Sequence, residues 1–124
     1  MENITVLIIE DNELNLKLVR SMLKLAHYQV LEAKDAEGGI LLAREHLPDL
    51  ILMDIQLPGI DGLDATKIIK DDPVLKHIPV VALTSCAMQG DEEKAISAGC
   101  NGYVAKPIDT RNFLDILSGY LRAN

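Results

Sequence analysis

Residues 49–63 read DLILMDIQLPGIDGL. The run from Asp49 to Met53 is continuously apolar after its first residue, which is typical of a strand buried on both faces of a parallel sheet. It ends in Asp54, and the Pro-Gly and Asp-Gly pairs that follow indicate a loop. A strand apolar on both faces needs helices over both faces, so this stretch favours a three-layer α/β fold.

The rest of the chain alternates short apolar runs with longer amphipathic stretches. Such alternation predicts parallel strands joined by right-handed helical crossovers, in a single doubly wound α/β domain over residues 1–124. Leu14, Leu18, Met22 and Leu25 recur at helical spacing in the first helix. We expect strands at 4–9, 28–33, 49–53, 80–83 and 102–105. We expect helices at 14–26, 36–45, 63–70, 90–98 and from a cap at Asp109 or Thr110 to about Leu121.

Length and charge restrict the possible classes. With 124 residues the chain suits one domain, and no output domain is expected after it. The formal net charge of -7 disfavours direct contact with nucleic acid or an anionic membrane and favours a protein partner or cations. No signal peptide or membrane-spanning run is evident, so a cytoplasmic location is expected. Cys86 and Cys100 form no CxxC pair, which indicates reduced thiols.

Polar residues follow the strands where each one ends. Glu10 and Asp11 follow the first strand, Asp54 the third, Thr84 the fourth and Lys106 the fifth. The carboxyl ends of parallel strands lie at one edge of the sheet, where ligands bind in open α/β folds. We therefore expect three carboxylates, a hydroxyl and an ammonium group in one pocket.

Crowded carboxylates repel one another unless a cation sits between them. Mg²⁺, or Mn²⁺ in its place, uses few carboxylates and keeps positions for water and phosphate oxygens. Asp11 and Asp54 are the expected direct ligands, with the backbone carbonyl of Gln56 as a third and Glu10 acting through water.

Such a pocket is suited to phosphoryl transfer, which needs mainly alignment and charge neutralisation. The carboxylate of Asp54 is the expected nucleophile and forms an acyl phosphate. Lys106 supplies positive charge, and Thr84 donates to a phosphoryl oxygen.

The chain resembles the receiver domains of two-component response regulators over essentially its whole length. The matching segments are LIIEDNELN, DLILMDIQLPGIDG, IPVVALTS and GYVAKPI. The phrases EDNELN, LILMDIQLP and AMQGDEEK resemble the stand-alone regulators of the DivK type. The resemblance implies a flavodoxin-like (βα)5 sandwich with strand order 2-1-3-4-5, and a cis bond between Lys106 and Pro107.

The resemblance also implies a function. Asp54 would accept a phosphoryl group from a histidine kinase or histidine phosphotransfer protein, and a protein-interaction surface would switch toward a downstream protein target. The domain would act as a signalling phosphoacceptor rather than an enzyme, as a monomer or weak dimer. Thr84 and Tyr103 match the family's switch pair, although Tyr103 could simply pack at the sheet edge.

Finer roles follow from position. Gln56 and Cys86 each lie two residues beyond a site residue, and we expect them to tune the lifetime of the acyl phosphate. Ser85 stands where the family usually has alanine, which is similarly small. Asn15 and Val19 are the expected contacts with the phosphodonor, whereas Asn12 and Leu16 are equally explained as a helix cap and a core residue.

Four alternatives remain open from the sequence. A flavin-binding electron carrier would need a phosphate loop where Glu10-Asp11 stands. An aspartyl-phosphate phosphatase would need an acid/base carboxylate where Gln56 stands. A degenerate receiver acting only as a scaffold conflicts with the intact set of site residues. The chain could also be a receiver excised from a hybrid histidine kinase or multidomain regulator.

Overall fold

The computed structural model describes residues 4–55, 57, 59–84, 91–105 and 111–122, with the backbone alone at 84, 91, 92 and 122. Five strands and five helices alternate along the described chain. The strands are β1 (Thr5–Ile9), β2 (Gln29–Ala33), β3 (Leu50–Asp54), β4 (Val80–Thr84) and β5 (Gly102–Ala105). The helices are α1 (Glu13–Leu25), α2 (Ala36–His46), α3 (Gly62–Asp71), α4 (Asp91–Ala98) and α5 (Phe113–Arg122).

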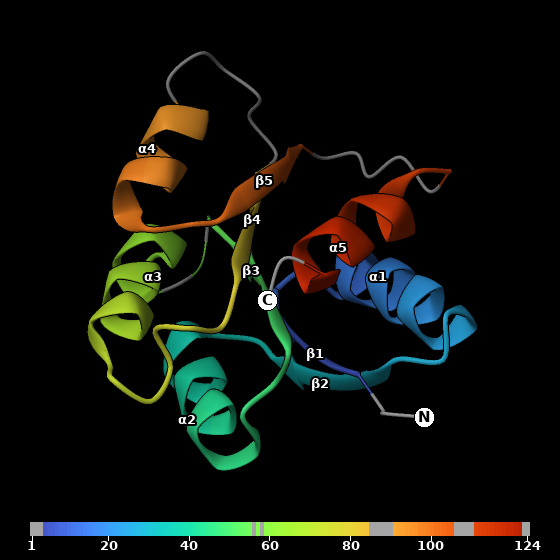
Figure 1. The fold of residues 1–124 in the computed structure, drawn as a ribbon, viewed down its shortest axis with the longest axis horizontal. Helices are drawn as coiled ribbons and strands as arrows, with labels where there is room; N and C mark the ends of the chain where they lie inside the picture. Colours follow the sequence, from blue (N-terminus) through green and yellow to red (C-terminus); the bar gives the residue numbers. More distant parts are fainter. Residues whose placement is uncertain (1–3, 56, 58, 85–90, 106–110, 123–124) are drawn as a thin grey trace.

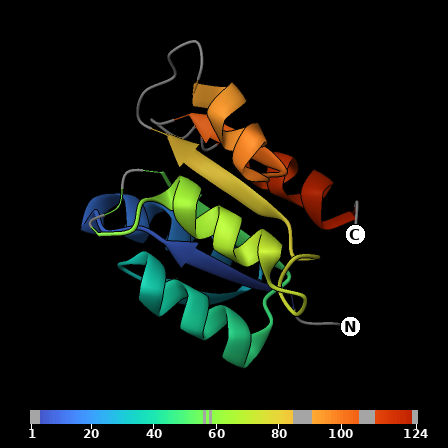
Figure 2. The same ribbon diagram turned by 90° about the vertical axis from the view of Figure 1, so that its left-hand side faces the viewer.

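The strands form one parallel sheet in the order β2-β1-β3-β4-β5, which confirms the expected topology. Helices α1 and α5 cover one face of the sheet, and α2, α3 and α4 cover the other (Figure 1). Figure 2 shows the second face, where α2, α3 and α4 lie one above the other. The three-layer arrangement follows from strands that are apolar on both sides.

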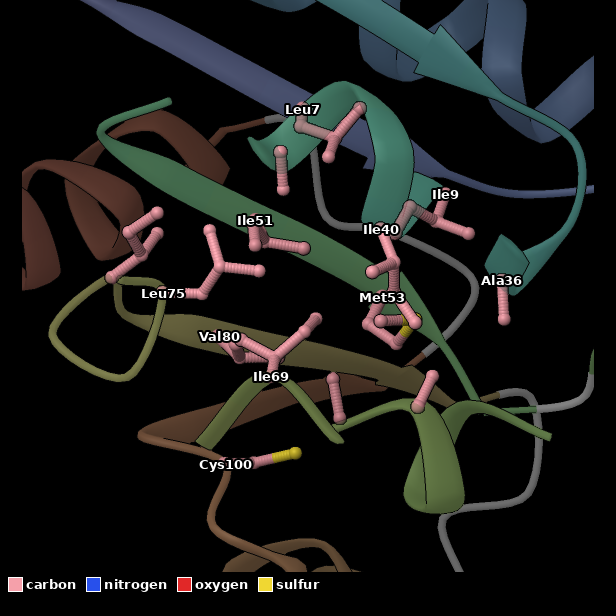
Figure 3. Packing of buried hydrophobic residues seen from close by; sticks show 14 of the residues in the cluster. Leu7, Ile9, Ala36, Ile40, Ile51, Met53, Ile69, Leu75, Val80 and Cys100 are labelled. Carbon is pink, nitrogen blue, oxygen red and sulfur yellow. The ribbon is translucent and has the colours of Figure 1, made fainter. Parts of the chain in front are cut away.

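Alternate residues of each strand enter two separate cores. Val6 and Ile8 of β1 pack under α1 and α5, whereas Leu7 and Ile9 pack under α2 and α3. Figure 3 shows the second core, in which Met53 of β3 lies among residues of the neighbouring strands and helices. All five residues of β3 are buried, so the central strand is held from both faces.

The buried face of α1 differs in part from the expected one, although Met22 is 6% exposed and lies in the core as expected. Leu14 and Leu25 are each 78% exposed and Leu18 is 39% exposed, whereas Leu16 and Val19 lie in the core with at most 2% exposure. The helix carries two apolar stripes at helical spacing, and spacing alone cannot decide which one packs on the sheet. The expected cap of α1 is confirmed: the side chain of Asn12 accepts a hydrogen bond from the backbone N–H of Asn15 at 3.1 Å.

The start of α5 also differs. The helix begins at Phe113, later than expected, and the backbone N–H of Ile116 donates to the carbonyl of Asn112 at 3.0 Å. The expected caps, Asp109 and Thr110, lie outside the described residues. Phe113, the first residue of the helix, is fully buried in the core under α1 and α5. In the described part of the chain, no helix is both long and apolar enough to cross a bilayer.

Gly39 in α2 allows close packing of the helix on β1. An added Cβ would lie 2.3 Å from Cδ1 of the buried Ile9. Gly119 in α5 is the opposite case, because nothing lies within 4 Å of the position that an added Cβ would take.

These two glycines give a matched stability test. Gly39→Ala should lower the free energy of unfolding by about 1–3 kcal/mol, because overpacking outweighs the gain in helix propensity. Gly119→Ala should raise it by about 0.5–1 kcal/mol, because only the propensity changes. Urea denaturation of both variants measures the two values, and a stabilised Gly39→Ala would contradict this packing.

Candidate functional site

Three carboxylates meet at the carboxyl edge of the sheet. Ile9 pairs with Met53, so Glu10 and Asp54 leave neighbouring strands at the same level. One oxygen each from Glu10, Asp11 and Asp54 lies within 4.8 Å of the others. Glu10 is 0% exposed and Asp54 is 4% exposed, whereas Asp11 faces solvent. The cluster is therefore buried at Glu10 and Asp54 and open to solvent at Asp11, so a ligand can enter from the Asp11 side.

The first loop is fixed by hydrogen bonds on both sides of Glu10. Its backbone N–H donates to the carbonyl of Ala33 at 3.0 Å, which extends the pairing of β1 with β2. Its carboxylate accepts the backbone N–H of Asn12 at 3.3 Å, next to the cap of α1. The acidic pair thus stands between a strand end and a helix start.

Gly62 fixes the second loop at its far end. Its N–H donates to the carbonyl of Ile55 at 2.9 Å. An added Cβ would lie only 2.2 Å from the backbone oxygen of Asp54. A side chain at this position would displace the backbone that carries Asp54, so the Asp-Gly pair is required by close approach as well as by the turn.

A neighbouring cation is already paired. Lys34, which follows β2 at the same edge, forms an ion pair with Glu13 in the first turn of α1. The hydrogen bond from Lys34 lowers the pKa of Glu13. Both groups are largely exposed, so this pair contributes little to stability, but it directs the Lys34 ammonium toward Glu13.

The donor set fits a hard divalent cation. Among the described residues, the cluster contains carboxylate oxygens and neither thiolate nor imidazole. Oxygen-only sets favour Mg²⁺ and Mn²⁺ over Zn²⁺ or copper. Glu10 and Asp54 are both buried carboxylates, and a cation bound between them would relieve the repulsion of their like charges.

The other predicted residues are placed in part. Thr84 ends β4 and its backbone pairs with Ala105, so the expected edge is correct. Tyr103 pairs with Ala82 and is half-buried against the core under α2 and α3. The remaining site residues lie outside the described residues: Gln56, Ser85, Cys86, Lys106 and Pro107.

The predicted donor contacts need one correction. Asn15 is half-buried near the start of α1 and stays a candidate. Val19 is wrong, because it is 0% exposed and packs between α1 and the sheet. The exposure of Leu14 and Leu18 on the same helix is not predicted by the sequence, because spacing alone does not decide which apolar stripe packs inward.

The structure thus places a buried aspartate at the end of the central strand of a 2-1-3-4-5 sheet, beside two further carboxylates. Residues 6–118 match the model of the response regulator receiver domain. The chain therefore belongs to the response regulator receiver family, and it is a phosphoacceptor domain of two-component signalling.

Individual relatives agree with this assignment. The chain is 49% identical over 117 residues to the polar-differentiation response regulator DivK of Brucella anthropi, covering 94% of this chain and 95% of that protein. DivK of Brucella ovis shows the same identity and coverage. The resemblance to DivK-type regulators is thus confirmed, and a flavin carrier is excluded.

Solved structures agree as well. A response regulator from Chloroflexus aurantiacus superposes with a TM-score of 0.94 at 28% identity, covering 98% of this chain and 99% of that chain. The receiver domain of sensor histidine kinase PA1611 from Pseudomonas aeruginosa superposes with a TM-score of 0.90 at 34% identity, with the same coverage. That structure has a magnesium ion coordinated in its active site cleft.

Removal of one carboxylate should have opposite effects on the stability of the cation-free domain and on its affinity for Mg²⁺. Asp11→Asn should raise the melting temperature in chelator, because it relieves repulsion within the cluster. The same variant should bind Mg²⁺ about tenfold more weakly or worse. Calorimetric titration and thermal melts with and without Mg²⁺ measure both effects. Asp64→Asn, an exposed position on α3, is the control and should change neither.

Proposed function

We propose that Asp54 is the phosphoacceptor and that its donor is the phosphohistidine of a histidine kinase or histidine phosphotransfer protein. The observation that carries this proposal is the position of Asp54: 4% exposed, at the end of β3, with an oxygen within 4.8 Å of Glu10 and Asp11. No other described aspartate combines burial with a place in a carboxylate cluster.

The proposed transfer is a single in-line displacement. A carboxylate oxygen of Asp54 forms a bond to phosphorus as the phosphorus–nitrogen bond of the donor breaks, and the released imidazole takes up a proton. As a carboxylate held beside a cation, Asp54 would attack without the help of a general base. Thr84 would donate to a phosphoryl oxygen, and Lys106 would pair with its charge.

A divalent cation supplies charge neutralisation in this proposal. Asp11 and Asp54 would bind Mg²⁺ directly, the backbone carbonyl of Gln56 would be a third ligand, and Glu10 would act through water. The oxygen-only donor set and the burial of Glu10 support this assignment. Mn²⁺, of similar preference for oxygen, would serve in its place.

The acyl phosphate would be transient, and the domain would turn over only its own phosphoryl group. Gln56 and Cys86 flank the approach of the attacking water in this proposal. Substitution of either Gln56 or Cys86 would change the rate of dephosphorylation without abolishing phosphorylation.

Phosphorylation would bias a surface formed by α4, β5 and α5. Thr84 and Tyr103 form the proposed switch, in which Thr84 moves toward the phosphoryl group and Tyr103 turns inward. The half-buried position of Tyr103 beside Ala82, one strand from Thr84, supports this role. A downstream protein target would bind the altered surface. We expect no direct contact with nucleic acid or membrane, and the domain would act as a monomer or weak dimer.

The donor would dock on the exposed stripe of α1. Leu14 is 78% exposed and Leu18 is 39% exposed, and Asn15 lies between them near the acidic edge. Exposed apolar side chains beside a reactive site are typical of a partner surface. Histidine kinases take their phosphoryl group from ATP, which is a cytoplasmic compound. The proposed donor therefore implies a cytoplasmic location for this domain.

Intact mass spectrometry tests the phosphoacceptor. Incubation with a small acyl-phosphate donor and Mg²⁺ should add one phosphoryl group to the wild type and none to Asp54→Asn. The exposed Asp64→Asn should be phosphorylated normally. A wild type that neither gains mass nor binds beryllium fluoride would indicate a scaffold, and repeated turnover of a small phosphomonoester would indicate a phosphatase.

Phosphotransfer kinetics test the docking surface. Leu18→Ser should slow transfer from a phosphorylated histidine protein by about fivefold or more, because one apolar contact is lost. Its phosphorylation by a small donor should be unchanged. Leu41→Ser on α2, where the leucine is 59% exposed, is the matched control. Equal rates for Leu18→Ser and wild type would place the donor on another face.

A further inference from the structure

Thr66 in the middle of α3 is a buried hydroxyl with two polar neighbours. It is 0% exposed, and its Oγ1 donates to the carbonyl of Gly62 at 2.8 Å. The Sγ of Cys100, which follows α4, donates to the same Oγ1 at 3.6 Å. Valine has the same shape as threonine and would fill this apolar space equally well. Packing alone therefore does not explain the hydroxyl at this position.

On one side, Thr66 is connected to the backbone that carries Asp54. Gly62, the acceptor of its hydroxyl, donates its own N–H to the carbonyl of Ile55 at 2.9 Å. The Cα of Gly62 lies so close to the carbonyl of Asp54 that no side chain fits between them. Two hydrogen bonds therefore join the Thr66 hydroxyl to the residue after Asp54.

On the other side, Thr66 is connected to the junction of α4 and β5. The backbone N–H of Cys100 donates to the carbonyl of Ala95 at 3.0 Å, which ties the thiol to the last turn of α4. Figure 3 shows Cys100 at the edge of the core, near Ile69 of α3. Burial raises the pKa of the Cys100 thiol, so it stays a neutral S–H donor at neutral pH.

Lys70, one turn further along α3, holds the same junction. Its ammonium donates to Oδ1 of Asn101 at 3.0 Å and to the carbonyl of Ile78 at 2.8 Å. Asn101 in turn accepts the backbone N–H of Val80 at 2.9 Å. The junction is thus fixed to α3 and to the start of β4.

The rest of the contact between α3 and α4 is looser. A groove of about 450 Å³ lies between the two helices, lined by Leu63, Lys67, Glu93, Lys94, Ser97 and Ala98. The junction at Cys100 and Asn101 is therefore where α3 holds the end of α4 by hydrogen bonds.

We propose that Thr66 is a positioning residue for the phosphoacceptor loop, and that the connection from Gly62 through Thr66 to Cys100 transmits the state of that loop to the junction of α4 and β5. The inference rests on the proposed role of Asp54. It adds a second route to α4, through the interior of α3 rather than along the ends of β4 and β5.

Titration of the ¹⁵N-labelled protein with beryllium fluoride in Mg²⁺ tests both parts. The affinity reports on positioning, and the amide resonances of Cys100 and Asn101 report on transmission. Thr66→Val removes the hydroxyl at constant shape, and Thr66→Ser retains it. Ser21→Ala is the matched control, because Ser21 makes the same type of bond to the carbonyl of Lys17 at 2.9 Å on the exposed side of α1.

In the wild type, Thr66→Ser and Ser21→Ala, both reporter amides should shift on binding, with affinities within about twofold of one another. Thr66→Val should bind about fivefold more weakly, as expected for the loss of one net hydrogen bond, and its reporter shifts should fall below half. A merely structural role would lower the melting temperature of Thr66→Val and move neither readout.

Each contrary result decides one point. Wild-type affinity in Thr66→Val overturns the positioning role, and full-size shifts at Cys100 and Asn101 in that variant overturn the transmission. If Thr66→Val fails to fold, Cys100→Ala removes the donor of the 3.6 Å contact and should likewise halve the shift at Asn101. Absence of binding by the wild type overturns the proposed role of Asp54 and this inference with it.

Discussion

The burial of a carboxylate at the end of the central strand is the constraint on which the site depends. All five residues of β3 are buried, and the last of them is Asp54. Within the cluster, Asp54 lies beside two more carboxylates, and like charges at such a distance repel one another. The apolar strand forces this geometry, because the packing that stabilises Leu50 to Met53 also fixes Asp54. The result is a pocket whose crowded carboxylates suit a divalent cation and, in the proposed function, a phosphoryl group beside it.

Much of the fold and of the acidic site could be predicted because their signals are local. The apolar runs at residues 5–9, 50–53 and 80–83 mark strands, and the residue type changes to acid or hydroxyl where each one ends. In a parallel sheet all such ends meet at one edge, so local marks become a three-dimensional cluster. The strand boundaries differ from the expected ones by at most one residue, and at β3 this difference brings Asp54 itself into the sheet.

Other features could not be predicted because they depend on contacts far apart in the sequence. The exposed stripe of α1 and its buried one have the same spacing, and only the sheet decides between Leu18 and Val19. The start of α5 coincides with the buried Phe113, which lies beyond the capping residues that the sequence indicates. The contact between Thr66 and Cys100 spans 34 residues and joins two side chains with no periodic signal. The Asp-Gly pair predicts only a turn at Gly62, whereas the structure shows that the backbone of Asp54 lies too close for any side chain at this position.

Helix α3 connects these features because both of its ends are anchored to polar groups. Its first residue, Gly62, lies against the carbonyl of Asp54, and its Lys70 binds the side chain of Asn101 before β5. A helix of ten residues is about 15 Å long and stiff along its axis. In the proposed transmission, a displacement of the loop after Asp54 would move the helix as a unit, with the Thr66 hydroxyl holding its first turn to Gly62. Gly62 thus has two roles. It allows the backbone of Asp54 to lie close to α3, and it accepts the hydrogen bond of Thr66. Through Thr66, the same helix also contacts Cys100.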